Sequence, residues 1–215
     1  RVQNAIPLSG FETVSPTYQF IKGLLRTVKD LQIDSDHMMA ISPDEGATSR
    51  AIYLANVLGL DMGMFYKRRD YTRIVNGRNP IVAHEFLGSS VEGKDVIVID
   101  DMISSGDSII DVATELKRRK AKRIYAAATF GLFTNGMDKF DKAYKDGIIS
   151  GILTTNLIYQ TPELLSKPYY INCDMSKYIA LIIDTLNHDG SISSILSPNE
   201  RIQHVLAKYR NGEPV

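Results

Sequence analysis

Short apolar runs alternate with longer amphipathic segments along most of the chain. The apolar runs are rich in β-branched residues, which is typical of strands buried on both faces. In the clearest run, KDVIVID, four consecutive apolar residues lie between Gly93 and a pair of acids. The pattern predicts strands at residues 38–42, 62–66, 94–100, 123–130, 151–157 and 169–175.

The amphipathic segments have the period and the terminal residues of helices. Pro16 suits the first position of one helix, Gly59 the C-cap of the next, and Ser108 the N-cap of a third. The pattern predicts helices at residues 15–31, 47–59, 108–121, 137–147, 175–190 and 198–210.

Alternation of buried strands with helices predicts an α/β fold, a parallel-rich sheet with helices on both faces. Such sheets bind ligands at the carboxyl ends of their strands. The residues at those ends are therefore the first candidates for a functional site.

Asp100 and Asp101 are expected where the third of these strands ends. A loop of small and hydroxyl residues, 102–107, leads from them to the next helix. Backbone N–H groups at a helix N-terminus bind anions, and serine hydroxyls add donors. Because carboxylates repel a phosphate, the two acids must face another group, either a sugar diol or a divalent metal. Simple capping of the strand and helix is the alternative.

Composition excludes several function classes. The chain has 215 residues, with 25 basic and 25 acidic side chains, so no net field favours nucleic acid or an anionic membrane. Its single cysteine, Cys173, rules out an internal disulfide framework and fits a reducing compartment. No apolar run approaches the ~18 residues of a membrane helix, and no signal peptide is apparent. The four histidines show no zinc-ligand spacing. We therefore expect a cytoplasmic protein with no membrane or nucleic-acid partner.

Four segments resemble the ribose-phosphate diphosphokinases (PRPP synthetases). VIVIDDMISSGDS is similar to the phosphoribosyl-binding signature that they share with type I phosphoribosyltransferases. SPDEGATSRA (42–51) resembles their diphosphate-binding loop, and KRR (67–69), after a strand, resembles the start of their flexible catalytic loop. DGSISSILS (189–197) is similar to their closing segment. The resemblance implies a type I phosphoribosyltransferase-like domain at 1–197, followed by a helical extension at 198–215.

The resemblance also implies an activity, the transfer of diphosphate from ATP to O1 of ribose 5-phosphate with Mg²⁺. By this resemblance Lys67 and Arg69 are catalytic and reach the transferring phosphates, and Arg69 also contacts ribose 5-phosphate. The remaining implied sites are the metal ligand Asp44; the diphosphate loop Asp44, Glu45, Gly46, Ala47 and Thr48; the ribose acceptors Asp100 and Asp101; the 5-phosphate loop Ser104, Ser105, Gly106, Asp107 and Ser108; and a regulatory phosphate site at Ser191 and Ser193.

The sequence departs from the family pattern at several positions. Ser104 stands where the family has Asp, Asp107 and Ala47 where it has Gly, and Phe130 where it has His. A negative Asp107 near a phosphate is unfavourable unless it points away or caps the helix. The first residues resemble the segment after the family's metal-binding Asp-x-His, so we expect this chain to correspond to the C-terminal part of a synthetase and to lack part of the ATP site.

Two other functions stay open at this point. A phosphoribosyltransferase that consumes PRPP fits the Ser-Ser-Gly loop but fits the 42–51 and 67–69 segments less well. A non-catalytic, synthetase-like regulatory subunit is favoured by Ser104 and Asp107. For a synthetase, the resemblance implies a homo-oligomer, a dimer or a hexamer.

Overall fold

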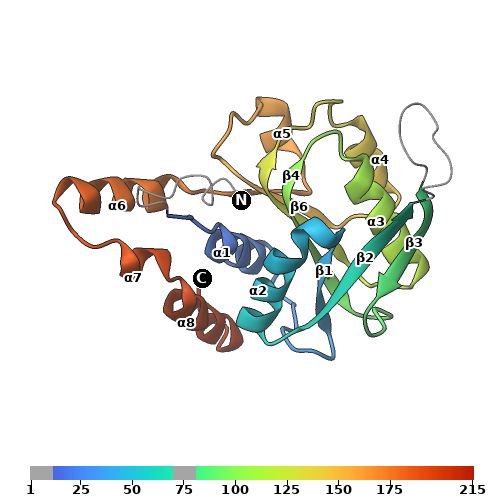
Figure 1. Ribbon diagram of the computed structural model, residues 1–215, viewed down its shortest axis with the longest axis horizontal. Coiled ribbons are helices and arrows are strands. Elements are labelled where there is room, and N and C mark those ends of the chain that lie inside the picture. The colour runs from blue at the N-terminus through green and yellow to red at the C-terminus, as the bar shows by residue number, and fades with distance from the viewer. Residues whose placement is uncertain (1–11, 70–80) are drawn as a thin grey trace.

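One seven-stranded sheet organises the molecule (Figure 1). The computed structural model describes residues 12–69 and 81–215, and of residues 67–69 and 81–84 only the backbone. The order across the sheet is β3-β2-β1-β4-β5-β6-β7. The strands are β1 (Met38–Ser42), β2 (Asp61–Arg69), β3 (Ile81–Leu87), β4 (Asp95–Ile103), β5 (Ile124–Gly131), β6 (Gly151–Thr155) and β7 (Tyr170–Cys173).

All neighbouring strands pair in parallel except β2 and β3, which pair antiparallel at one edge. The central strands β1 and β6 are buried at every position, as expected for a sheet covered on both faces. This confirms the predicted parallel-rich α/β fold. The sequence pattern did not predict β3 as a defined strand.

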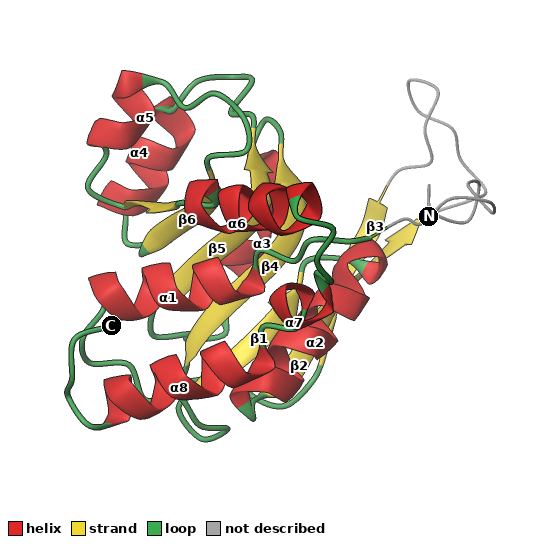
Figure 2. Ribbon diagram, turned by 90° about the vertical axis from the view of Figure 1, so that its left-hand side faces the viewer, coloured by secondary structure: helices red, strands yellow, loops and turns green. Residues whose placement is uncertain are grey.

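Helices form a layer on each face of the sheet (Figure 2). One hydrophobic cluster joins the sheet to α3 (Asp107–Arg118), α4 (Asp138–Lys145) and α5 (Pro162–Ser166). The other joins it to α1 (Thr17–Thr27), α2 (Thr48–Leu58) and α8 (Asn199–Arg210). The remaining helices are the 3-10 turn η2 (Glu45–Ala47), α6 (Ser176–Asn187) and α7 (Ser193–Leu196). Within the described ranges, no helix is both long enough and apolar enough to cross a bilayer.

Some predicted boundaries were wrong near the candidate site. KRR (67–69) does not follow β2 but forms its end, because its backbone pairs with residues 81–84 of β3. Similarly, β4 continues past Asp100 and Asp101 to Ile103, since β5 runs beside it as far as Gly131. Asp101, which the predicted strand 94–100 left out, therefore lies within β4 beside Asp100.

Two predicted caps also differ from the structure. Pro16 is the N-cap residue of α1, one position before the helix begins. Ser108 is not the N-cap of α3, because Gly106 takes that position with a positive φ of 85° and the helix begins at Asp107. Gly59 is confirmed as a C-cap in the left-handed conformation.

The C-terminal helix α8 packs on the domain core. Ile202, Val205 and Leu206 are buried in the cluster that includes α1. The hydroxyl of Tyr209 donates to the Val28 carbonyl at 2.9 Å and accepts from the Leu31 amide at 2.8 Å. These bonds join α8 to the end of α1 and the loop that follows it.

A buried ion pair joins β4 to the start of β5, and we predict a large effect of removing it. Arg123 donates to both carboxylate oxygens of Asp95 at 2.9 and 2.7 Å, and the Asp95 side chain is only 4% exposed. Arg123→Ala leaves this carboxylate buried without its guanidinium, so we expect unfolding free energy to fall by about 3 kcal/mol. Urea unfolding followed by circular dichroism measures the change.

Arg118→Ala is the matched control, since the Arg118 side chain is 77% exposed and pairs with Glu115 at 3.5 Å. Exposed pairs contribute about 0–1 kcal/mol, so this variant is expected to stay near wild type. Equal losses of unfolding free energy in the two variants would show that the buried pair of Asp95 and Arg123 stabilises the protein no more than an exposed pair does.

Candidate functional site

Two adjacent carboxylates lie near the carboxyl end of the central strand β4. Asp100 is half-buried and Asp101 is exposed. The Asp101 amide donates to Oδ1 of Asp100 at 2.8 Å, which fixes the Asp100 side chain. Arg50, in the first turn of α2, approaches Oδ2 of Asp101 at 3.4 Å. The pair thus presents carboxylate oxygens, which accept hydrogen bonds from hydroxyls or ligate a cation.

Asp100 is the more perturbed acid of the pair. The pKa of Asp100 is raised to about 6, mainly by burial and also by the negative charges of Asp101 and Asp44, against the lowering effect of the Asp101 amide. Three carboxylates, two at the end of β4 and one in the loop after β1, therefore act on one region. A cation bound among them, or a diol donating hydrogen bonds, would favour the charged form of Asp100.

The loop after β4 brings the N-terminus of α3 beside these acids. Gly106 is buried, and a Cβ at this position would lie 2.1 Å from Cζ of Phe140, so the close approach requires glycine. The backbone N–H groups of Ser108 and Ile109 make no hydrogen bond within the described part of the chain. With the exposed hydroxyls of Ser104 and Ser108, they form a set of donors suited to a phosphate.

Asp107, the unfavourable charge noted in the sequence, has two partners. Its Oδ2 accepts from the Ser105 hydroxyl at 2.9 Å, and its Oδ1 pairs with the ammonium of Lys139 on α4. These hydrogen bonds lower the pKa of Asp107, the Lys139 bond most. Lys139 therefore neutralises the Asp107 carboxylate, which lies among the phosphate donors of residues 104–109, here called the donor loop.

The segment 42–51 runs from the end of the neighbouring strand β1 through a second loop and η2 into the start of α2. Oδ1 of Asp44 caps η2 by accepting from the amides of Gly46 at 2.9 Å and Ala47 at 3.3 Å. Its Oδ2 makes no hydrogen bond to any described residue. Glu45 is exposed, and the Thr48 hydroxyl lies 3.4 Å from the Asp44 carbonyl.

The carboxylates of this site fit a Mg²⁺ ion that also binds substrate phosphates, rather than one enclosed by protein ligands alone. The described residues hold no group of three or more acidic, histidine or cysteine side chains arranged for a metal. Mg²⁺ commonly uses one or two carboxylates and takes its other ligands from water and substrate phosphates. Asp44 and Asp100 provide such carboxylates.

A cavity of about 380 Å³ opens next to Asp100, between the start of α1 and α2. Polar side chains at its wall include Ser49, Arg50, Tyr53 and Thr129. Cavities of this size accept small organic ligands. Asp100 thus faces a space large enough for a sugar or part of a nucleotide.

The other predicted site residues lie outside this group. Lys67 and Arg69 end β2, and their side chains are outside the described residues. Ser191 precedes α7 and Ser193 begins it, with their hydroxyls 3.2 Å apart. Figure 1 shows α7 well away from α3. Cys173 is buried, which raises its thiol pKa to about 12.

The structure adds two residues that the sequence analysis did not single out. Arg50 belongs to the quoted segment 42–51, so its place beside the acids had a sequence signal. Lys139 lies more than thirty residues beyond the donor loop, and only the packing of α4 on α3 brings it to Asp107. No local pattern marks it.

Lys139 gives the first testable prediction for the loop. Lys139→Ala leaves Asp107 negative beside the donors, so we expect the loop's affinity for a phosphate ligand, with ribose 5-phosphate as the probe that the resemblance implies, to fall about fivefold through charge repulsion. Isothermal titration calorimetry measures this affinity. Lys142→Ala is the control, because Lys142 lies on the same helix but pairs with Asp146. Unchanged affinity in Lys139→Ala would show that Asp107 does not act on the bound anion.

Comparisons with known proteins place this site in a family. The model of the phosphoribosyl transferase domain matches residues 18–166. A ribose-phosphate pyrophosphokinase of Thermococcus kodakarensis is 31% identical over 166 residues, covering 72% of this chain and 57% of that protein. That of Vibrio parahaemolyticus is 29% identical, covering 75% of this chain and 49% of that protein.

A solved structure shows the same fold. The phosphoribosylpyrophosphate synthetase of Mycobacterium smegmatis matches with a TM-score of 0.59 and 23% identity, covering 71% of this chain and 46% of that one. This chain thus spans about half the length of the relatives it matches. The family match covers strands β1 to β6, the Asp44 loop, the acids of β4 and α3, and we conclude that the chain belongs to the phosphoribosyl transferase domain family.

Proposed function

We propose that this chain supplies the ribose 5-phosphate and diphosphate sites of a ribose-phosphate diphosphokinase. The enzyme would transfer diphosphate from ATP to O1 of ribose 5-phosphate, giving PRPP and AMP. The observation that carries the proposal is the placement of Asp100 and Asp101 between the donor loop of α3 and the Asp44 loop. The names of the relatives support the same reaction.

In this proposal each part of the site has one role. Asp100 and Asp101 accept hydrogen bonds from the ribose hydroxyls. The amides of Ser108 and Ile109, with the hydroxyls of Ser104 and Ser108, bind the 5-phosphate at the positive end of the α3 dipole. These contacts hold O1 toward the loop of Asp44.

The diphosphate would lie at the 42–51 loop, where Glu45 to Thr48 line its path. A Mg²⁺ ion, bound by Asp44, would neutralise charge on the phosphates. Phosphoryl-type transfer depends on positioning and charge neutralisation more than on covalent chemistry. Lys67 and Arg69 would supply further positive charge to the transferring group. Ser191 and Ser193 remain the proposed regulatory phosphate ligands, and a homo-oligomer the proposed assembly.

Calorimetric titration with ribose 5-phosphate, with and without Mg²⁺, tests the proposal. We expect saturable binding in the wild type and a loss of more than about tenfold, or ~1.4 kcal/mol, in Asp101→Ala. Lack of binding, or equal binding in the variant, would contradict it. Ribose 5-phosphate-dependent release of AMP from ATP, measured on a protein that joins this chain to a complete ATP site, then tests catalysis itself.

A non-catalytic ribose-phosphate-binding subunit is the second candidate. It is favoured by the bond from Ser105 to Asp107, which commits one hydroxyl of the donor loop to a carboxylate. This candidate predicts ribose 5-phosphate binding without AMP release. A transferase would instead release diphosphate from PRPP when a base is supplied.

A further inference from the structure

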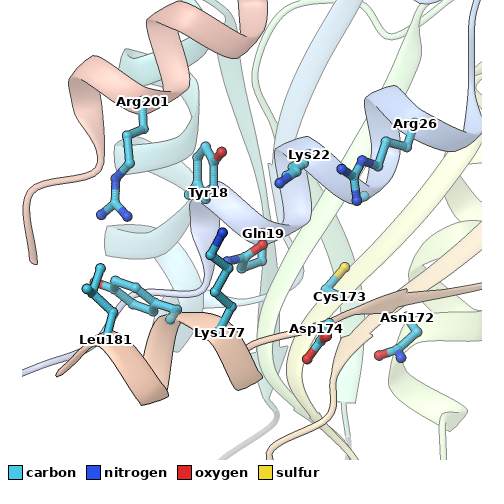
Figure 3. A pocket seen from close by; sticks show the side chains of 12 residues that line it. Tyr18, Gln19, Lys22, Arg26, Asn172, Cys173, Asp174, Lys177, Leu181 and Arg201 are labelled. Carbon is cyan, nitrogen blue, oxygen red and sulfur yellow. The ribbon is translucent and has the colours of Figure 1, made fainter. Parts of the chain in front are cut away.

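A second cavity, of about 450 Å³, lies between α1, α6, α8 and the end of β7. Figure 3 shows its lining side chains pointing into the space between these elements. It is larger than the cavity beside Asp100 and within the range of small-ligand pockets.

This cavity is separate from the donor loop of α3. It lies at β7, an edge strand, and two strands, β5 and β6, separate β7 from β4. It also borders α1 and α8, which pack in the opposite hydrophobic cluster from α3. A ligand here would therefore not contact the donor loop of α3.

The cavity gathers positive charge from three helices. Lys22 and Arg26 come from α1, Lys177 from α6 and Arg201 from α8, whereas Asp174 is the one acid in the lining. Oδ1 of Asp174 is already hydrogen-bonded, since it accepts from the Asn156 side-chain amide at 2.7 Å and the Ser176 backbone amide at 2.8 Å.

None of the four cations forms an ion pair with a described carboxylate side chain, but the Arg26 guanidinium donates to the Val215 carbonyl oxygen at 2.7 Å. Lys177 makes no hydrogen bond within the described residues, and Lys22 contacts only the Tyr18 ring, at 5.7 Å. Burial lowers the pKa of Lys22, and the charges of Arg26 and Lys177 lower it further. The cations thus repel one another, and an anion among them would remove that repulsion.

One of the cations is held rigidly. The Arg201 guanidinium lies 5.4 Å from the Tyr18 ring and 5.3 Å from the Tyr178 ring, and it donates to the Ile195 carbonyl. The Tyr178 hydroxyl donates to the same carbonyl at 2.9 Å. A fixed guanidinium loses little conformational entropy when it binds a phosphate.

We propose that the cavity lined by Lys22, Arg26, Lys177 and Arg201 is a second anion site, which binds a small molecule bearing a diphosphate group. A single phosphate, with a charge near −2, would leave an excess of positive charge among four cations and one acid. Two linked phosphates balance that charge, and they can reach cations on different helices.

Calorimetric titration of the 215-residue chain with inorganic diphosphate tests the proposal, with excess ribose 5-phosphate present to occupy the loop at α3. We expect Lys22→Gln/Lys177→Gln to weaken diphosphate binding by at least about tenfold, since charge-assisted hydrogen bonds are lost. Lys122→Gln/Lys145→Gln removes the same charge from exposed sites and should change affinity less than about twofold.

The single variant Lys177→Gln replaces the double variant if the latter does not fold, because Lys177 is exposed on α6. It should fold as the wild type does and bind diphosphate more weakly. The proposal would be overturned if the cavity double variant and the control double variant changed diphosphate affinity equally, or if both bound diphosphate as the wild type does. So would monophosphate binding as tightly as diphosphate, or binding of an acidic peptide in place of diphosphate.

The two proposals fail independently. If Asp101→Ala leaves ribose 5-phosphate binding intact, the proposed function fails, but the Lys22/Lys177 comparison still decides the second site. If the cavity variants behave as the wild type, only the second site is lost.

Discussion

Gly106→Ala is expected to destabilise the protein and to weaken the proposed binding of ribose 5-phosphate. Gly106 has a φ of 85°, a conformation that costs an alanine about 1–2 kcal/mol. The new Cβ would lie 2.1 Å from Cζ and 2.7 Å from Cε2 of Phe140. That ring is fully buried and packs edge-on against Phe133, with centroids 5.2 Å apart, so it has no free space to move into.

The loop must therefore shift instead, and overpacking of this kind costs about a further 1–3 kcal/mol. We expect a total loss of about 3 kcal/mol in unfolding free energy, measured by urea denaturation. Because Gly106 connects the serines to α3, the shift also moves the donors. Binding of ribose 5-phosphate should weaken by more than about tenfold under conditions in which the variant remains folded.

Gly136→Ala separates backbone strain from the clash. Gly136 has a φ of 75°, but a Cβ there would meet nothing within 4 Å. This control should lose only the conformational term, about 1–2 kcal/mol, and keep its affinity for ribose 5-phosphate. If Gly106→Ala loses no more stability than Gly136→Ala, the contact with Phe140 does not fix the loop.

The sheet and its helices were predictable because their signals are local. Buried parallel strands read as apolar runs, and α2 ends at Gly59 as its sequence indicates. The sequence pattern gave wrong strand ends where pairing with a neighbouring strand determines the length of a strand. The length of β4 past Asp100 depends on β5 beside it, and the strand character of KRR depends on β3.

Part of the candidate site was also predictable from a local sequence signal. The order of acids, serines and glycine from Asp100 to Ser108 is continuous in the sequence, so its motif could be read directly. The start of α3 was misplaced, because Ser108 is a common N-cap residue while the structure uses the left-handed conformation of Gly106. Lys139 and the cation cavity depend on which helices pack together, which no single segment specifies.

Asp100→Asn is expected to stabilise the protein while weakening the proposed binding of ribose 5-phosphate. The folded pKa of Asp100 is raised to about 6 from 3.8, mainly by burial. A carboxyl with a raised pKa binds more protons in the folded state, so stability falls as the pH rises from about 4 to 6 and stays lower above that range. The asparagine is neutral at every pH and avoids this cost.

Because Asp100 is only partly buried, solvent screening reduces the effect, and we expect a gain of about 1 kcal/mol at pH 7. At pH 4 the variant and the wild type should be nearly equal in stability. Urea denaturation at both pH values measures the difference. Asp111→Asn, an exposed acid on α3, is the control and should change stability little at either pH.

The gain in stability should come with a loss of binding. An amide cannot accept from two ribose hydroxyls as a carboxylate does, nor ligate Mg²⁺ with a full charge, so affinity for ribose 5-phosphate should fall by about tenfold or more. A variant that gains stability and keeps its affinity would show that Asp100 is buried for a reason other than binding. Loss of both would show that its carboxylate contributes to the fold.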